Sequence, residues 1–304
     1  MSVRRRLIGL RDVLTGAGRQ AAAHERQLLA TGRLLSQSSR ARGRLAALSE
    51  VEFSVFSQFG DDGIIQWLIE HLDLPSKTFI EFGVENYRES NTRFLMMNDN
   101  WSGLVMDGSA SSVEEIRRAD YYWRHELEAV CAFVDQSNIN ALLSASAMPR
   151  DVGLLHIDLD GNDYWIWKAI DVVDPAIVIL EYNSIFGLER AITVPYDPHF
   201  VRSVAHPSHL YFGASLRAIY QLSKARGYAF VGCNSAGNNA YFVRHDKLND
   251  VVREVALEDG YVCSKYRESR GSDGELSFLT GGQRLAVLQG QPVFNVITEQ
   301  VEPL

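Results

Sequence analysis

Cysteine is scarce in this chain of 304 residues, with only Cys131, Cys233 and Cys263, which lie far apart. No two of them have the spacing of a zinc site, so the sequence predicts reduced thiols and no disulfide framework. No apolar run is long enough for a transmembrane helix, and no signal-peptide pattern opens the chain. These absences predict a globular protein of the cytoplasm.

Lysine is absent from the first fifty residues, where ten arginines and only three acidic residues give a net charge of +7. Because the whole chain has a net charge of −8, residues 51–304 carry −15. Such an acidic body argues against a nucleic-acid partner. The basic segment could contact a membrane surface, an anionic partner or the acidic body of a second copy, and we expect a homo-oligomer.

Short apolar runs alternate with amphipathic segments through most of the chain. The pattern predicts helices over residues 19–51, 61–72, 91–98, 112–122, 137–144, 162–171 and 214–226. It predicts strands over residues 78–82, 103–106, 128–134, 152–158 and 176–181, then an antiparallel pair over 228–233 and 239–243. This order predicts an α/β fold, in which a doubly wound, mostly parallel sheet of seven strands carries helices on both faces.

The rhythm of elements divides the chain into three parts. Residues 1–52 form a basic helical N-terminal extension, residues 53–256 the main domain and residues 257–304 a C-terminal extension. Within the main domain, residues 184–213 contain three prolines and three histidines but no clear element. Loops of this length are usually functional or disordered, and we expect this insertion to form a lid over an acceptor.

Acidic residues stand at the ends of the first three predicted strands. Glu81 is followed by Gly83, Asp107 ends the second strand, and Asp135 follows the third. A glycine there permits a tight turn, and an acid at the second strand end is where dinucleotide folds hold a ribose. The three strand ends together predict a nucleoside site.

Two later strands also end in acids. The fourth runs into Asp158 and Asp160, directly after His156, and the fifth ends at Glu181. Because neighbouring parallel strands present their carboxyl ends at one edge, these groups are expected in one crevice. They could perform acid–base chemistry or hold a cation, although Asp158 could also cap the next helix and His156 could be a core residue.

Four motifs resemble the FkbM-like S-adenosylmethionine-dependent methyltransferases. Residues 56–63 (FSQFGDDG) resemble the opening motif of the family, and EFGVE at 81–85 with SNT at 90–92 resembles the first cofactor motif. HIDLDG at 156–161 and NNAYFV at 238–243 resemble the later strand end and the closing hairpin. The resemblance covers about residues 53–245 and implies a class I methyltransferase, Rossmann-like fold. It also implies methyl transfer from S-adenosylmethionine to a hydroxyl group, commonly on sugars or natural products.

The resemblance also implies a set of cofactor-binding residues, namely Gln58, Glu81, Gly83, Asn91, Asp107, Gly108, Ser109 and Asp135. Glu81 and Gly83 would line the methionine end, Asp107 would hold the ribose hydroxyls, and Asp135 would lie near the adenine amine. One position departs from the pattern, because Tyr87 stands where the family's glycine-rich turn has a small residue.

The catalytic residues expected for hydroxyl methylation are His156, Asp158 and Glu181. In one mechanism a histidine removes the proton. In the other, Mg²⁺ held by Asp158, Asp160 and Glu181 lowers the pKa of the hydroxyl. The acceptor is expected to be a small molecule or an oligosaccharide. A nicotinamide-dependent oxidoreductase is disfavoured because no Gly-x-Gly-x-x-Gly follows the first strand, and a catalytically degenerate scaffold is the remaining alternative.

Overall fold

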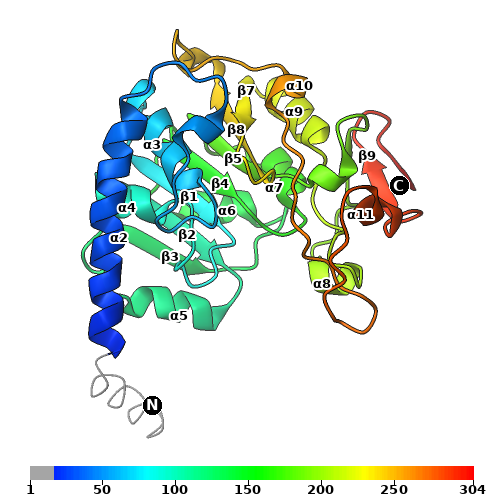
Figure 1. The fold of residues 1–304 in the computed structure, drawn as a ribbon, viewed down its shortest axis with the longest axis horizontal. Coiled ribbons are helices and arrows are strands. Elements are labelled where there is room, and N and C mark those ends of the chain that lie inside the picture. Colours follow the sequence, from blue (N-terminus) through cyan, green and yellow to red (C-terminus); the bar gives the residue numbers. More distant parts are fainter. Residues whose placement is uncertain (1–16) are drawn as a thin grey trace, which may run out of the picture.

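The computed structural model describes residues 17–304, as a sheet covered by helices on both faces (Figure 1). The arginine-rich start of the chain, on which the prediction of a basic arm largely rests, lies outside the described residues. No helix between residues 17 and 304 has both the length and the hydrophobicity of a membrane span.

The central sheet has seven strands in the order β3-β2-β1-β4-β5-β8-β7. Its strands are β1 (Thr78–Phe82), β2 (Ser102–Asp107), β3 (Leu127–Cys131), β4 (Leu154–Ile157), β5 (Ile177–Glu181), β7 (Tyr228–Cys233) and β8 (Asn239–Arg244). The first five are parallel, and β8 is antiparallel to both of its neighbours. This is the doubly wound, mostly parallel seven-stranded sheet of a Rossmann-like fold, as predicted.

Alternating apolar side chains of the strands supply two cores, one on each face of the sheet. In β1, Phe79 points to one core and Ile80 to the other. The first core is covered by α3 (Asp61–His71), α4 (Arg93–Asp99) and α5 (Ala110–Arg118). The second is covered by α6 (Ile139–Ala145), α7 (Asp163–Ala169), α9 (Leu216–Ala225) and α10 (Leu257–Gly260). Strands β1, β2, β4 and β5 are therefore buried on both faces, which explains their nearly continuous apolar sequences, whereas the edge strand β3 exposes Glu128.

The expected helix over residues 19–51 is wrong in its second half. Helix α2 (Ala17–Arg40) ends at Arg40, and a separate 3₁₀ turn, η1 (Leu48–Val51), packs beside α3. The indole of Trp67 donates to the carbonyls of Arg42 (3.3 Å) and Gly43 (3.2 Å), and thus holds the chain where it turns back. Tertiary packing rather than local periodicity decides this boundary.

The insertion at 184–213 is not the irregular loop that its sequence suggested. It contains the 3₁₀ turn η2 (Ser184–Phe186), β6 (Ile192–Thr193) and α8 (Arg202–Ala205). Strand β6 pairs with β9 (Pro292–Asn295), which pairs with β10 (Gln300–Pro303). The insertion and the C-terminal extension, with α11 (Gly282–Ala286), thus form one unit beside the end of the main sheet (Figure 1). Its small core consists of Phe186, Ile192, Val194, Leu210, Tyr211, Leu288 and Val293.

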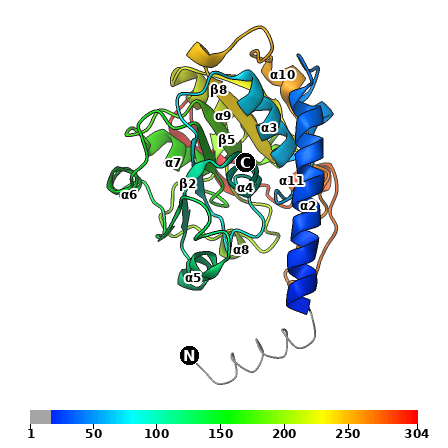
Figure 2. The same ribbon diagram turned by 90° about the vertical axis from the view of Figure 1, so that its left-hand side faces the viewer.

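Helix α2 runs along one side of the molecule, where it contacts α3 and α4 (Figure 2). Its contact is largely polar and centres on Gln66 of α3. The side-chain oxygen of Gln66 accepts hydrogen bonds from Ser36 (2.5 Å) and Arg40 (2.7 Å). Its side-chain nitrogen donates to Asp99 at 2.6 Å, and Asp99 also pairs with Arg40. A network of this kind depends on every member being satisfied.

Removing the guanidinium from this network should destabilise the protein. We expect Arg40→Ala to lower the free energy of unfolding by about 1–3 kcal/mol, because Asp99 and Gln66 lose a charge-assisted partner. Urea denaturation followed by circular dichroism measures this change. Arg33→Ala is the control, since Arg33 lies on the same helix with an exposed side chain. Equal stability of the two variants would contradict the prediction.

Candidate active site at the carboxyl edge of the sheet

A cavity of about 420 Å³ opens at the carboxyl ends of β1, β2, β4 and β5. Ten of the twelve site residues expected from the sequence line it, namely Gln58, Glu81, Gly83, Asn91, Asp107, Gly108, His156, Asp158, Asp160 and Glu181. The parallel strands therefore bring together the acids that the sequence placed at their ends.

Ser109 and Asp135 are the two expected residues that do not line this cavity. The hydroxyl of Ser109 accepts a hydrogen bond from the Ser112 amide (3.3 Å) and caps α5. The carboxylate of Asp135 accepts bonds from the hydroxyl (2.6 Å) and amide (2.7 Å) of Ser137, which lower its pKa. Phe133, two residues before Asp135, does line the cavity and is 53% exposed.

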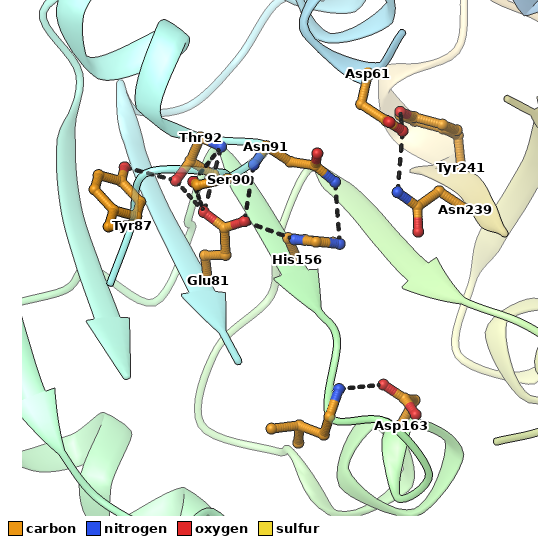
Figure 3. Close-up of polar contacts among 11 residues, drawn as sticks. Asp61, Glu81, Tyr87, Ser90, Asn91, Thr92, His156, Asp163, Asn239 and Tyr241 are labelled. Carbon is orange, nitrogen blue, oxygen red and sulfur yellow. Dashed lines mark hydrogen bonds and ion pairs between the residues drawn. The ribbon is translucent and has the colours of Figure 1, made fainter. Parts of the chain in front are cut away.

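Glu81 is the most heavily bonded side chain of the site (Figure 3). Its carboxylate accepts hydrogen bonds from the hydroxyl of Ser90 (2.6 Å), the amide of Asn91 (3.0 Å), and both the amide (3.3 Å) and the hydroxyl of Thr92. Nδ1 of His156 lies 2.9 Å from Oε1, the oxygen that also accepts from the Asn91 amide. Burial opposes the charge, but His156 and the hydroxyls lower the pKa of Glu81. Glu81 thus ties the loop after β1 to strand β4.

Both ring nitrogens of His156 are occupied by side chains. Nδ1 contacts Glu81, and Nε2 lies 3.2 Å from the side-chain nitrogen of Asn91. The ring is 3% exposed, and although burial disfavours its charge, Glu81 and Asp158 raise its pKa. A general base needs a free nitrogen within reach of the acceptor, so this arrangement favours a positioning role for His156.

Asp107 ends β2 at the cavity wall, where two backbone amides hold its carboxylate. The amide of Glu85 donates to one oxygen (2.8 Å) and that of Ser109 to the other (2.7 Å). Each oxygen keeps a lone pair that could accept from a diol. The contact with Glu85 requires the chain to turn back sharply after β1.

Gly83 makes that turn possible. It has a φ of +72°, and a Cβ at this position would lie 1.7 Å from the carbonyl oxygen of Asp158. No side chain fits there without moving β1 away from β4. The departure at Tyr87 is accommodated, because its ring is fully buried and its hydroxyl lies 2.8 Å from that of Thr92.

Three carboxylates, those of Asp158, Asp163 and Glu181, each place an oxygen within 4.8 Å of the other two. One oxygen of Glu181 is buried and has no hydrogen-bond partner among residues 17–304. Burial, reinforced by the neighbouring acids, raises the pKa of Asp158 to about 7 and that of Glu181 well above its ordinary value. Close carboxylates of this kind need a proton or a cation between them. The donor set therefore fits a hard divalent cation.

The third carboxylate of this group is Asp163 and not the expected Asp160. Asp160 is exposed and pairs with Arg202 (3.1 Å) on the insertion. Asp163 accepts hydrogen bonds from the amides of Leu159 (2.8 Å; Figure 3) and Gly161 (3.1 Å), so the first turn of α7 folds back over the end of β4. Its burial raises its pKa to about 6. In the sequence, the signal for this contact is that Asp163 follows Asp158 by five residues, across a Gly-Asn turn that can bring the two carboxylates together.

Residues that the sequence did not suggest complete the cavity. Asp61 lies at its edge, where its carboxylate accepts hydrogen bonds from Tyr241 and Asn239 (3.0 Å; Figure 3). Phe200 and Arg202 of the insertion also line it. They come from a segment more than 100 residues after β1 in the chain, so local patterns could not assign them.

The raised pKa of Asp158 predicts that its charge costs stability. Because the folded protein holds this proton more tightly than the unfolded chain, stability should fall as the pH rises from about 4 to about 7 and then level off. In the presence of a chelator, Asp158→Asn should therefore increase the free energy of unfolding by about 1–3 kcal/mol at about pH 8, and by much less at about pH 4.

Urea denaturation at the two pH values measures this difference. Asp259→Asn is the matched control, because Asp259 is exposed. If Asp158→Asn were no more stable than the parent chain above pH 7, the charge of Asp158 would not be the destabilising group.

Comparison with known proteins gives a likeness of fold. No protein-family model matches the chain, and no curated protein sequence matches it. An O-methyltransferase structure from Bacillus cereus is 12% identical, covers 72% of this chain and 91% of its own, and has a TM-score of 0.40. A structure of an S-adenosylmethionine-dependent methyltransferase from Clostridium acetobutylicum is 13% identical, covers 60% of this chain and 90% of its own, and has a TM-score of 0.38. One from Aquifex aeolicus is 9% identical, covers 64% of this chain and 94% of its own, and has a TM-score of 0.37.

Proposed function

We propose that this chain is an S-adenosylmethionine-dependent O-methyltransferase that acts on a hydroxyl group of a sugar or glycosylated metabolite, with the help of a divalent cation. The observation that carries the proposal is one shared cavity. Asp107, suited to a ribose diol, opens onto the same space as Asp158 and Glu181, suited to activating a hydroxyl.

Methyl transfer asks little covalent chemistry of the protein. The acceptor oxygen forms a bond to the methyl carbon, the carbon–sulfur bond breaks, and the hydroxyl proton leaves. When bound, S-adenosylmethionine supplies an activated methyl group on a positively charged sulfur. The remaining tasks are to align the acceptor and to take up its proton. The fold provides alignment through the Glu81 network, which fixes the loop 83–92 and β4.

Asp158 and Glu181 are the groups best suited to the proton. The pKa of Asp158 is raised to about 7, which is near the optimum for a general base at neutral pH. If a divalent cation is held by Asp158, Asp163 and Glu181, it lowers the pKa of a hydroxyl bound beside it. The unpartnered oxygen of Glu181 supports the metal alternative, and the occupied ring of His156 weighs against a histidine base.

The insertion supplies the acceptor side of the cavity. Phe200 offers an apolar face and Arg202 a hydrogen-bond donor, and Asn162 lines the cavity beside them from the start of α7. A ring face combined with polar groups suits a sugar. The segment is fastened to the β4 end by the Arg202–Asp160 pair and by Asn162, whose side chain donates to the Asp197 carbonyl at 2.9 Å. We propose that residues 184–213 close over the acceptor when it binds.

The alternative, a catalytically degenerate scaffold, was supported mainly by the departure at Tyr87, and the structure accommodates that residue. Tyr87, the one departure from the family's glycine-rich turn, is packed inside the core and does not line the cavity. Nothing at that position obstructs a cofactor. The space and the acids that the reaction needs are therefore intact.

The ribose contact can be tested without knowledge of the acceptor. We expect Asp107→Ala to weaken binding of S-adenosylhomocysteine roughly tenfold or more, because two charge-assisted hydrogen bonds are lost. Isothermal titration calorimetry measures the affinity. Asp135→Ala is the control: its carboxylate faces its own turn, so the affinity should change much less. Unchanged affinity in Asp107→Ala would reject this assignment.

The cation site can be tested by titration with MnCl₂ and by turnover. We expect Glu181→Gln and Asp163→Asn each to weaken Mn²⁺ binding roughly tenfold or more, and Asp160→Asn to leave it nearly unchanged. In a turnover assay, excess EDTA should abolish activity and Mg²⁺ should restore it. Full activity in the chelator would reject the metal, and a large loss in Asp160→Asn alone would restore the ligand set expected from the sequence.

A further inference from the structure

A second cavity, of about 740 Å³, lies away from the sheet edge, between α2, α4 and the segment from α5 to residue 125. Five arginines line it, namely Arg26, Arg88, Arg93, Arg118 and Arg124. Only three acids do so, which are Glu25, Glu115 and Asp120. The wall is therefore positive, although the chain as a whole has a net charge of −8.

Arg93 anchors the floor of this cavity. It is 6% exposed, and its guanidinium lies over the rings of Phe56 (4.1 Å) and Tyr121 (4.8 Å). One terminal nitrogen donates to the Arg88 carbonyl (3.2 Å) and the other pairs with Glu25 (3.0 Å). Its Nε is buried without a partner. A buried guanidinium with an unused donor can still gain a hydrogen bond.

His125 adds a second unsatisfied group. Its Nδ1 is also buried without a partner, and the ring lines the same cavity. Burial, followed by the neighbouring Arg124, lowers its pKa, so near neutral pH the ring can contribute a hydrogen bond to an anion but no positive charge. Two nitrogen atoms in one cavity wall thus lack partners within the described residues.

The other arginines are held loosely at the rim. Arg88 pairs with Glu115 at 3.6 Å, and Arg124 pairs with Asp120 at 3.4 Å, with more than half of each side chain exposed. Surface pairs of this kind contribute little and exchange readily. Arg118 pairs with Glu114, which does not line the cavity, and within residues 17–304 no carboxylate lies at ion-pair distance from Arg26. These four guanidinium groups are free to turn toward an anion.

The cavity adjoins the candidate active site through one loop. Residues Glu85 and Glu89 line the active-site cavity, while Asn86 and Arg88, between them in the sequence, line the arginine cavity. Tyr87 lies buried between the two faces. A ligand that draws Arg88 inward would therefore act on the loop whose Glu85 amide holds Asp107.

We propose that the arginine cavity binds a phosphate or pyrophosphate group and that its occupancy alters cofactor affinity through residues 83–93. The planar fork of a guanidinium matches two oxygens of a phosphate, and several such forks around one space select a compact group of high negative charge. The binding part of this proposal does not depend on the methyltransferase function. The coupling part rests on it.

Sodium pyrophosphate is the probe for the binding test. Isothermal titration with the full chain should give saturable binding that weakens as the salt concentration rises. The double variant Arg26→Ala/Arg118→Ala should bind roughly tenfold or more weakly. Arg253→Ala is the matched control, because Arg253 is exposed and pairs only with Asp250 nearby. Absence of saturable binding, or equal affinity in the double variant, would overturn the site.

Vesicles distinguish a lipid headgroup from a free anion. Binding to phosphatidylcholine vesicles that contain phosphatidic acid, absent with pure phosphatidylcholine and reduced in the double variant, would identify the headgroup as the source. Pyrophosphate binding without vesicle binding would identify a free phosphorylated ligand. Vesicle binding that is equal in the double variant, without pyrophosphate binding, would overturn the proposal.

The coupling is tested by titrating S-adenosylhomocysteine with and without saturating pyrophosphate. We expect a change in affinity of about fivefold or more, lost in the double variant. If S-adenosylhomocysteine binds with the same affinity in both conditions, the coupling is wrong. If it does not bind at all while pyrophosphate does, the methyltransferase function fails and the anion site stands.

Discussion

The buried carboxylate of Glu81 is the constraint on which both halves of the candidate site depend. Ionised groups are costly inside a protein, and this one is retained because hydroxyls, amides and an imidazole surround it. Glu81 and His156 are also register partners in adjacent strands, so their contact fixes β1 beside β4. The loop that carries Asn91 and approaches Asp107 is thereby held from the same point. Replacing Glu81 by an apolar residue would leave several buried donors unsatisfied at once.

The acids at the strand ends could be predicted from the sequence because their position depends only on where each apolar run stops. An apolar run that stops at an acid places that acid at the sheet edge, and parallel order collects the edges, which is how Asp107, Asp158 and Glu181 were found. The same reasoning failed where side chains satisfy their own turns, as Asp135 does. It also missed Asp163, because only the folded turn shows that the start of α7 returns to the end of β4. The end of α2 depended on Trp67, a contact far away in the chain.

The charges of Asp158 and Glu181 are held close together at some expense in stability. Both acids have raised pKa values, and Arg202, which opposes this shift at Glu181, is engaged by Asp160. Perturbed acids of this kind gather at functional sites more often than elsewhere. The Glu81–His156 pair shows the opposite arrangement, since every polar atom is satisfied and the pair serves as framework. One cavity therefore contains a satisfied acid–imidazole pair beside a group of close carboxylates with raised pKa values.

The three-stranded sheet beside the main one has a consequence for the order of folding. Strand β6 meets β9 about a hundred residues later in the chain, and Arg190 pairs with Glu302 across a similar separation. Closing so long a loop costs entropy, and the core that helps to offset it has only seven buried side chains within the described residues. Strands β1, β2 and β3 have nearer partners and can assemble first. The unit formed by the insertion and the C-terminal extension then becomes the last part of the protein to form and the first to open, so a partly folded chain would present the Asp107 side of the cavity before Phe200 and Arg202 close its other side.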